Sequence, residues 1–172
     1  MKTLRRDRRR AGVLVTLLAV LLGGFIFTAP DTAPEARGAA PVDEARRRFD
    51  QAVLMLHAKQ YEHAAVALHR VLALSPQLPE AHVNMGYALL GLQRVSQARS
   101  FFDAATALKP DQANAYYGLA LAYEAEGDLA LATGAMRSYL HLAREERPEH
   151  LRRARAALWE WEQARSGAAQ WR

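Results

Sequence analysis

Three histidines are the residues whose type and spacing come closest to a metal site. His57, His63 and His69 recur every six residues. A helix turns by about 100° per residue, so a spacing of six rotates a side chain by about 240°. The ligands of one metal ion must converge on a single point, which this spacing prevents on a helix. We therefore expect no metal site.

Carboxylates and nucleophiles are no better placed for catalysis. Glu124, Glu126 and Asp128 lie at the end of a predicted helix and in the turn after it, where acidic side chains usually cap helices or face water. The chain has no cysteine, and it shows neither a glycine-rich phosphate loop nor a nucleophile elbow. We expect no catalytic residues and no cofactor, and hence a protein that is not an enzyme.

The net charge of +5 is concentrated at the N-terminus. Residues 1–10 contain Lys2, five arginines and Asp7, which account for the whole positive excess. The rest of the chain sums to zero, so we expect no nucleic-acid partner. The interpretation of residues 1–10 is a basic cytoplasmic N-terminus.

Residues 11–29 form an uncharged stretch with eleven Val, Leu, Ile or Phe residues. About 19 helical residues span roughly 28 Å, close to the thickness of a bilayer core. We expect a transmembrane anchor. The alternative is a cleaved signal peptide, although Ala29 and Ala40 are poor cleavage sites because proline follows each of them.

The basic start also predicts the orientation of this anchor. Positive charge is retained on the cytoplasmic side, so the rest of the chain should lie outside the cytoplasm. Residues 30–44 are rich in Pro and Ala and predict a linker. The high Ala and Arg content is typical of bacterial proteins. We expect a single-pass protein of a bacterial inner membrane with a periplasmic C-terminal domain.

From Ala45 onward the sequence repeats with a period of 34 residues. Each unit has two helical stretches separated by a break, near residues 59–60, 93–94 and 127–128. Two columns of small residues allow antiparallel helices to cross closely, and larger columns fill the space beyond. The columns are Ala52/Gly86/Ala120, Ala64/Ala98/Ala132, Leu68/Phe102/Met136, Val71/Ala105/Tyr139 and Leu74/Leu108/Leu142.

This pattern resembles the tetratricopeptide repeat (TPR) family. The second unit is nearest to the family pattern, through Gly86, Ala98, Phe102, Ala105 and Pro110. The resemblance implies an all-α TPR solenoid of three helix pairs, residues 45–78, 79–112 and 113–146, preceded here by the transmembrane helix.

A further helix is predicted at residues 148–165, where it would cap the open apolar end of the array. One face at helical spacing carries Leu151, Ala154, Ala157, Leu158 and Trp161. Trp159 lies outside this face and is a candidate exposed contact, the alternative being that it leans on its own helix. Residues 166–172 predict a frayed tail.

In the TPR family the first helices of successive repeats line a concave groove that holds a partner. By repeat phase, the resemblance places in this groove Phe49, Val53, Leu56, Val83, Asn84, Tyr87, Leu90, Asn114, Tyr117, Leu121 and Glu124. Val53 and Leu121 are equally expected to pack helices only. The basic residues that clamp a C-terminal carboxylate in some members are missing. We expect a protein or peptide partner with an apolar segment, anchored by Tyr87 and Tyr117.

The resemblance implies a membrane-tethered scaffold or chaperone that holds a partner at the extracytoplasmic face for complex assembly. Cytochrome c maturation and envelope or secretion assembly are the candidate pathways. The alternatives are a cleaved, soluble periplasmic adaptor and a self-associating structural protein, that is, a homo-oligomer.

We predict that protein purified from membranes keeps residues 11–29, because no good cleavage site follows them. Intact-mass spectrometry of the C-terminally tagged chain checks this. A mature chain that begins near Pro30 or Pro41 would show the cleaved adaptor instead.

Overall fold

The computed structural model describes residues 34–144 and 146–170. The predicted basic N-terminus, the transmembrane segment at 11–29 and the last two residues lie outside this part of the chain. Residues 1–37 form one unit, of which only the first turn of a helix is described, and residues 38–172 form a second unit that holds the repeats. In the described ranges no helix is both long and apolar enough to cross a membrane.

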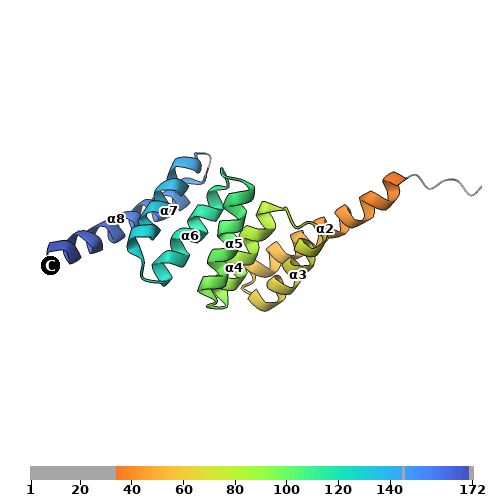
Figure 1. Cartoon of the computed structure of the whole chain (residues 1–172), viewed down its shortest axis with the longest axis horizontal. Coiled ribbons are helices and arrows are strands. Elements are labelled where there is room, and N and C mark those ends of the chain that lie inside the picture. The colour runs from red at the N-terminus through yellow and green to blue at the C-terminus, as the bar shows by residue number, and fades with distance from the viewer. Residues whose placement is uncertain (1–33, 145, 171–172) are drawn as a thin grey trace, which may run out of the picture. The chain divides into compact units, whose positions relative to one another are not determined.

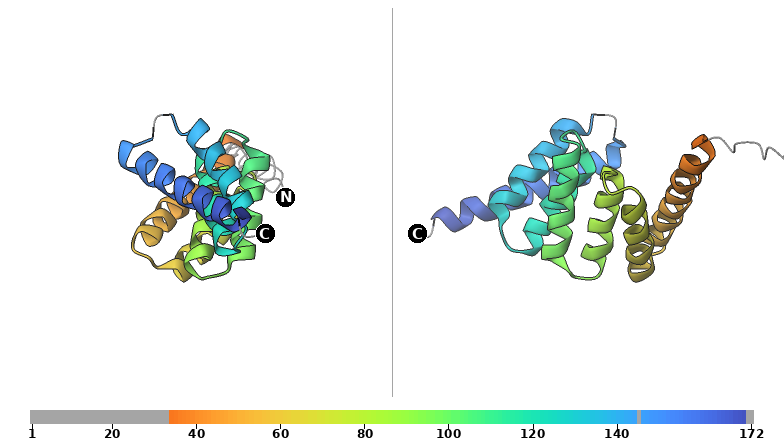
Figure 2. Two further views of the ribbon diagram at one scale, coloured as in Figure 1. Left: turned by 90° about the vertical axis from the view of Figure 1, so that its left-hand side faces the viewer. Right: turned by 45° about the vertical axis from the view of Figure 1, so that its right-hand side comes forward.

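Helices follow one another throughout the described residues (Figure 1). They are α2 (Pro34–His57), α3 (Tyr61–Leu74), α4 (Pro79–Gly91), α5 (Val95–Leu108), α6 (Ala113–Ala125), α7 (Leu129–Leu142) and α8 (Pro148–Gln170). From α3 to α8 each helix packs against the next, and α4 also packs against α6. Figures 1 and 2 show α4 to α7 side by side in chain order. The predicted all-α array of helix pairs with a further C-terminal helix is confirmed.

Two boundaries differ from the sequence expectation. Helix α2 begins at Pro34, so residues 34–44, predicted as a linker, are helical. Proline is favourable in the first turn of a helix, and the Glu, Ala and Arg residues that follow it are good helix formers. At the other end α8 continues to Gln170, past the predicted start of the tail at residue 166.

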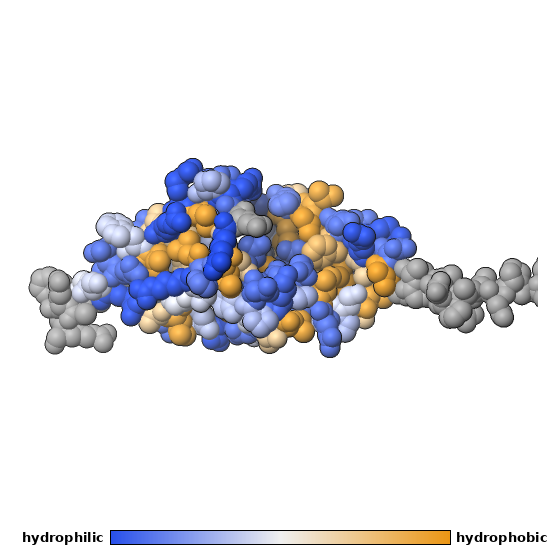
Figure 3. Space-filling model, turned by 90° about the horizontal axis from the view of Figure 1, so that it is seen from above, coloured by the Kyte–Doolittle hydropathy of each residue, from blue (hydrophilic) through white to orange (hydrophobic). Residues whose placement is uncertain are grey.

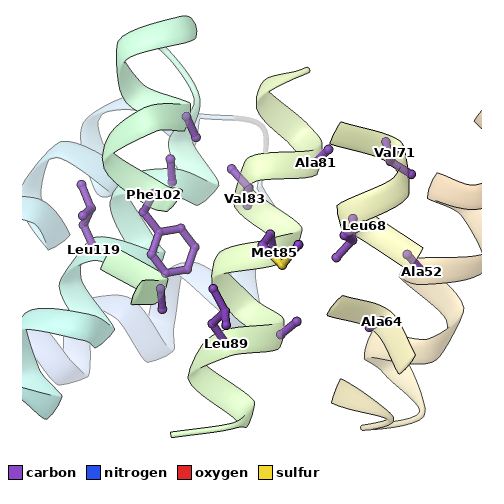
Figure 4. Packing of buried hydrophobic residues seen from close by; sticks show 14 residues of the cluster. Ala52, Ala64, Leu68, Val71, Ala81, Val83, Met85, Leu89, Phe102 and Leu119 are labelled. Atoms are coloured by element: carbon purple, nitrogen blue, oxygen red, sulfur yellow. The ribbon is translucent and has the colours of Figure 1, made fainter. Parts of the chain in front are cut away.

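The predicted columns of small residues lie in the core, where Figure 4 shows two of their members, Ala52 and Ala64. Every member of these two columns is buried, and Leu68, Phe102 and Met136 are among the largest side chains that are fully buried. Val71, Ala105 and Tyr139 are buried as well, whereas Leu74 and Leu108 are exposed. Four of the five columns therefore mark the core, and the fifth reaches its surface.

Phe102 on α5 lies between two glycines of the neighbouring helices. A Cβ atom added to Gly86 would come within 2.5 Å of Phe102 Cε1, and one added to Gly118 would come closer still to the same ring atom. Overlaps of this size leave no room for alanine at either position. The absence of two side chains thus lets one ring touch the backbones of α4 and α6 together.

Each repeat reverses direction through one residue with positive φ. These residues are Lys59 (φ 57°), Gln93 (φ 60°) and Gly127 (φ 81°). At each break the next amide donates to the carbonyl five residues earlier, as Arg94 N does to Leu89 O at 2.9 Å. This hydrogen bond belongs to the Schellman motif that ends many helices. The three predicted breaks are confirmed, and glycine fills only one of them.

We predict opposite effects for two glycine-to-alanine substitutions. Gly118→Ala should lower the free energy of unfolding by about 1–3 kcal/mol, because the added methyl group overpacks the Phe102 site. Gly134→Ala should raise it by roughly 0.5–1 kcal/mol, because alanine favours a helix interior and no atom lies within 4 Å of the added Cβ. Urea unfolding followed by circular dichroism measures both. A Gly118→Ala protein as stable as wild type would contradict the close packing.

Candidate partner-binding groove

A cavity of about 270 Å³ brings the second and third repeats together with the C-terminal helix. Its lining residues are Tyr87 on α4, Asn114 and Tyr117 on α6, Tyr139 on α7, Glu146 in the following loop, and His150 and Arg153 on α8. Tyr87, Asn114 and Tyr117 are residues that repeat phase predicts for the groove. We call this site the tyrosine cavity.

Tyr87 mainly contacts neighbouring helices of the array and contributes less to the open surface of the groove. Its hydroxyl donates to the carbonyl oxygen of Asn114 at 2.9 Å, which ties α4 to the first turn of α6. Its ring meets Phe102 edge-on, with 5.2 Å between the centroids. Burial raises the pKa of Tyr87 well above the ordinary value, so the phenol stays protonated. The hydroxyl proton of Tyr87, which we predicted to be an anchor for the partner, is therefore already donated within the chain.

Tyr117 contributes a second half-buried aromatic ring to the tyrosine cavity. This ring lies against that of Tyr139, with 5.0 Å between the centroids and 55° between the planes. Tyr139 is itself buried, and burial, with a smaller contribution from Glu146, raises its pKa. Tyr139 was not predicted as a site residue, although it is the aromatic member of a core column. A tilted pair of rings of this kind can hold an apolar side chain.

Charged residues close the other side of the tyrosine cavity. Glu146 Oε1 accepts from Arg147 N at 3.0 Å and lies 3.0 Å from His150 Nδ1. The bond from the Arg147 amide, followed by that from His150, lowers the pKa of the Glu146 carboxyl, so it stays ionised at neutral pH. This end of the groove is thus more polar than predicted. Glu146 is the last residue of the third repeat, and His150 and Arg153 follow it, so none of the three belongs to a repeat column.

The remaining predicted groove residues lie elsewhere. Val83 is only 3% exposed and belongs to the core, so it is corrected from a groove residue to a packing residue. Phe49 and Leu90 are partly buried against the same core, and Asn84 is half-buried outside the tyrosine cavity. Groove phase alone cannot tell these packing positions from open ones, because each faces both a neighbouring helix and the groove.

Glu124, also predicted for the groove, binds the C-terminal helix instead. Its carboxylate accepts from Trp161 Nε1 at 2.9 Å, which joins α6 to α8. A second link joins α7 to α8, where Arg137 and Glu162 form an ion pair at 2.7 Å. The apolar face predicted for α8 packs on the array through Leu151, Ala154, Ala157, Leu158 and Trp161. Its role as a packed cap is confirmed.

Two other candidate sites have clear positions. Trp159 is 62% exposed, as its place outside the apolar face of α8 predicts. His57, His63 and His69 are all exposed. Among residues 34–144 and 146–170, no group of three His, Asp or Glu side chains is close enough to hold a metal ion.

Paired helices stacked in one direction define the class of helical-repeat proteins, whose extended surfaces commonly serve for binding. Residues 55–120 match the family model for the tetratricopeptide repeat. No curated protein matches the sequence significantly.

Three solved TPR structures illustrate the shared fold. The Sgt2 TPR domain of Aspergillus fumigatus is 18% identical, with a TM-score of 0.66 and a match over 74% of this chain and 82% of that one. The Yersinia enterocolitica secretion chaperone SycD, in complex with a peptide of the translocator YopD, is 14% identical with a TM-score of 0.66. The match covers 72% of this chain and 95% of that one. The first TPR of Spaghetti, bound to an HSP90 peptide, is 21% identical with a TM-score of 0.65. The match covers 72% of this chain and 94% of that one.

We predict that Glu124 and Trp161 are energetically coupled. Trp161→Phe should lower the free energy of unfolding by about 1–3 kcal/mol, because it removes the donor to a charged acceptor and some packing. Glu124→Gln should lower the free energy of unfolding by less in the Trp161→Phe background than in wild type. The difference between the two decreases is the coupling energy of the double-mutant cycle, which measures the hydrogen bond. Trp159→Phe is the matched control, with a change within about 0.5 kcal/mol. Additive effects of the two substitutions would contradict the link.

Proposed function

We propose that this protein is a membrane-tethered interaction scaffold or chaperone, which holds a segment of a partner protein in the tyrosine cavity. The observation that carries the proposal is the cavity itself. It gathers the half-buried ring of Tyr117 and the exposed Asn114, both on α6, with ionised Glu146 from the loop between α7 and α8. A small number of polar groups that converge beside aromatic rings is typical of a binding site.

The partner segment that suits this cavity carries an apolar side chain. It is an internal segment of the partner protein, away from the partner's C-terminus. The apolar side chain packs on the rings of Tyr117 and Tyr139, while the Asn114 amide is free to bond the partner's backbone. Spaghetti and SycD are recorded with bound peptides, which supports peptide capture by this fold. Glu146 would repel a terminal carboxylate placed beside it, since like charges at an interface are costly.

The tether places the partner at a membrane. The apolar residues 11–29 supply the anchor, and the basic residues before them favour a C-terminal domain outside the cytoplasm. In a bacterial inner membrane, this arrangement suits a scaffold that presents a partner during the assembly of a larger complex. Cytochrome c maturation and envelope or secretion assembly are two processes that need such presentation.

Exposed Trp159 supports a second candidate function, self-association through α8. A surface tryptophan at 62% exposure is costly to leave in water and is frequent among residues that dominate interfaces. In this alternative α8 binds a second copy of the chain, and no peptide is required.

We predict that Tyr117→Ala lowers partner recovery at least tenfold, the effect of losing roughly 1.4 kcal/mol or more of binding free energy. The full-length, C-terminally tagged protein is crosslinked in membranes, and co-purified proteins are quantified by mass spectrometry. Tyr87→Phe should keep recovery within about twofold, because its hydroxyl proton already goes to Asn114. Leu108→Ala, an exposed apolar site outside the cavity, is the control.

Two results would count against the peptide scaffold. Unchanged recovery in Tyr117→Ala, with circular dichroism showing a folded protein, would remove the cavity from binding. Recovery of only the protein itself, lost in Trp159→Ala, would establish self-association.

A further inference from the structure

A second groove lies between α3 and α5 and shares no residue with the tyrosine cavity. It encloses about 550 Å³. Its lining residues are Ala65, Val66, His69 and Arg70 from α3, Met85 and Leu89 from α4, and Arg94, Gln97, Ser100 and Phe101 at the start and along the length of α5. Two helices thus form the walls and α4 forms the floor. We call it the α3–α5 groove.

The floor and one wall of this groove are apolar. Met85 and Leu89 are almost fully buried members of the core, yet their surfaces still form the bottom of the groove. Phe101 is half-buried, and Val66 is 60% exposed at the rim. Hydrophobic residues are indeed most concentrated toward the end of the array that holds α2 and α3 (Figure 3). An exposed apolar patch beside such a floor is typical of an interaction site.

The charges of the lining are of one sign. Arg70 and Arg94 line the groove with His69, and no carboxylate is among the lining residues. Within the described residues, neither Arg70 nor Arg94 takes part in an ion pair. The groove therefore has an apolar floor with free positive charge beside it.

The equivalent position one repeat later carries larger side chains of the chain itself. Leu89 corresponds to Tyr123 and Ala65 to Arg99, by the period of 34. The Arg99 guanidinium lies over the Tyr123 ring, 5.7 Å from its centroid, and its Nε is 3.6 Å from Glu126. Arg94 corresponds to Asp128, which inverts the charge. The later position is covered by its own side chains, whereas the α3–α5 groove has short or apolar residues there.

We propose that the α3–α5 groove docks an amphipathic α-helix of a partner protein whose apolar face is flanked by acidic residues. The helix lays its apolar side chains on Met85, Leu89 and Phe101, as in other helix-in-groove complexes. Its carboxylates face Arg70 and Arg94, and this complementarity selects an acidic helix over a basic one. Lining residues recur along α3 and α5 at helical spacing, so the groove follows the helices for about two turns.

A charge-swap titration tests this proposal. The probe is a fluorescein-labelled peptide of about 18 residues, or five helical turns, with leucine at helical spacing on one face and glutamate on both flanks. A second peptide carries lysine in place of glutamate. Each is titrated with the full-length protein in nanodiscs of neutral lipid, and fluorescence anisotropy is read against empty nanodiscs.

We predict that the glutamate peptide binds wild type at least tenfold more tightly than the lysine peptide. Charge reversal by Arg70→Glu with Arg94→Glu should invert this order. Arg152→Glu with Arg155→Glu, on exposed positions of α8, makes the same change in net charge and should leave the order unchanged. Val66→Glu, at an exposed position, should weaken the glutamate peptide at least tenfold while circular dichroism stays native.

Three outcomes would overturn the proposal. If the two peptides bound all variants with equal affinity, Arg70 and Arg94 would not select an acidic helix. Binding that is lost in Tyr117→Ala but kept in Arg70→Glu with Arg94→Glu would place the peptide in the tyrosine cavity. A concentration-dependent mass that Val66→Glu abolishes in analytical ultracentrifugation would identify a second copy as the occupant.

Discussion

The contact of the Phe102 ring with the backbones of α4 and α6 is the constraint on which the array depends. Because the ring touches Gly86 and Gly118 together, one side chain sets how closely the second and third repeats approach. Tyr87 lies edge-on to the same ring and bonds the first turn of α6. The tyrosine cavity is therefore built on a core contact, and the proposed partner-binding surface inherits its rigidity from packing.

Much of this fold follows from the sequence because a repeat shows each helix contact more than once. Three independent residues report whether a position is small, large or a break, as with Leu68, Phe102 and Met136. The period also locates the breaks at Lys59 and Gln93, which have no glycine to mark them and have positive φ in the structure. The apolar face of α8 and the exposure of Trp159 follow from helical spacing alone.

The candidate site was predicted only in part, since its geometry depends on contacts between residues far apart in the chain. Glu146 is the last residue of the third repeat and His150 follows it, so no repeat column indicates that they close a cavity against Tyr87. Glu124 has the phase of a groove residue, yet Trp161, on a helix outside the repeat pattern, captures its carboxylate. Val83 has groove phase too, but core packing covers it.

The position of the tryptophans gives the protein an optical property of its own. All three tryptophans of the chain follow residue 158, so the repeats themselves contain none. Trp161 is buried beside Glu124, whereas Trp159 faces water. In a linear array the ends open more readily than the middle. Tryptophan emission therefore reports the docking of α8 at one end and is blind to the first two repeats, which makes it a native reporter of local opening next to the tyrosine cavity.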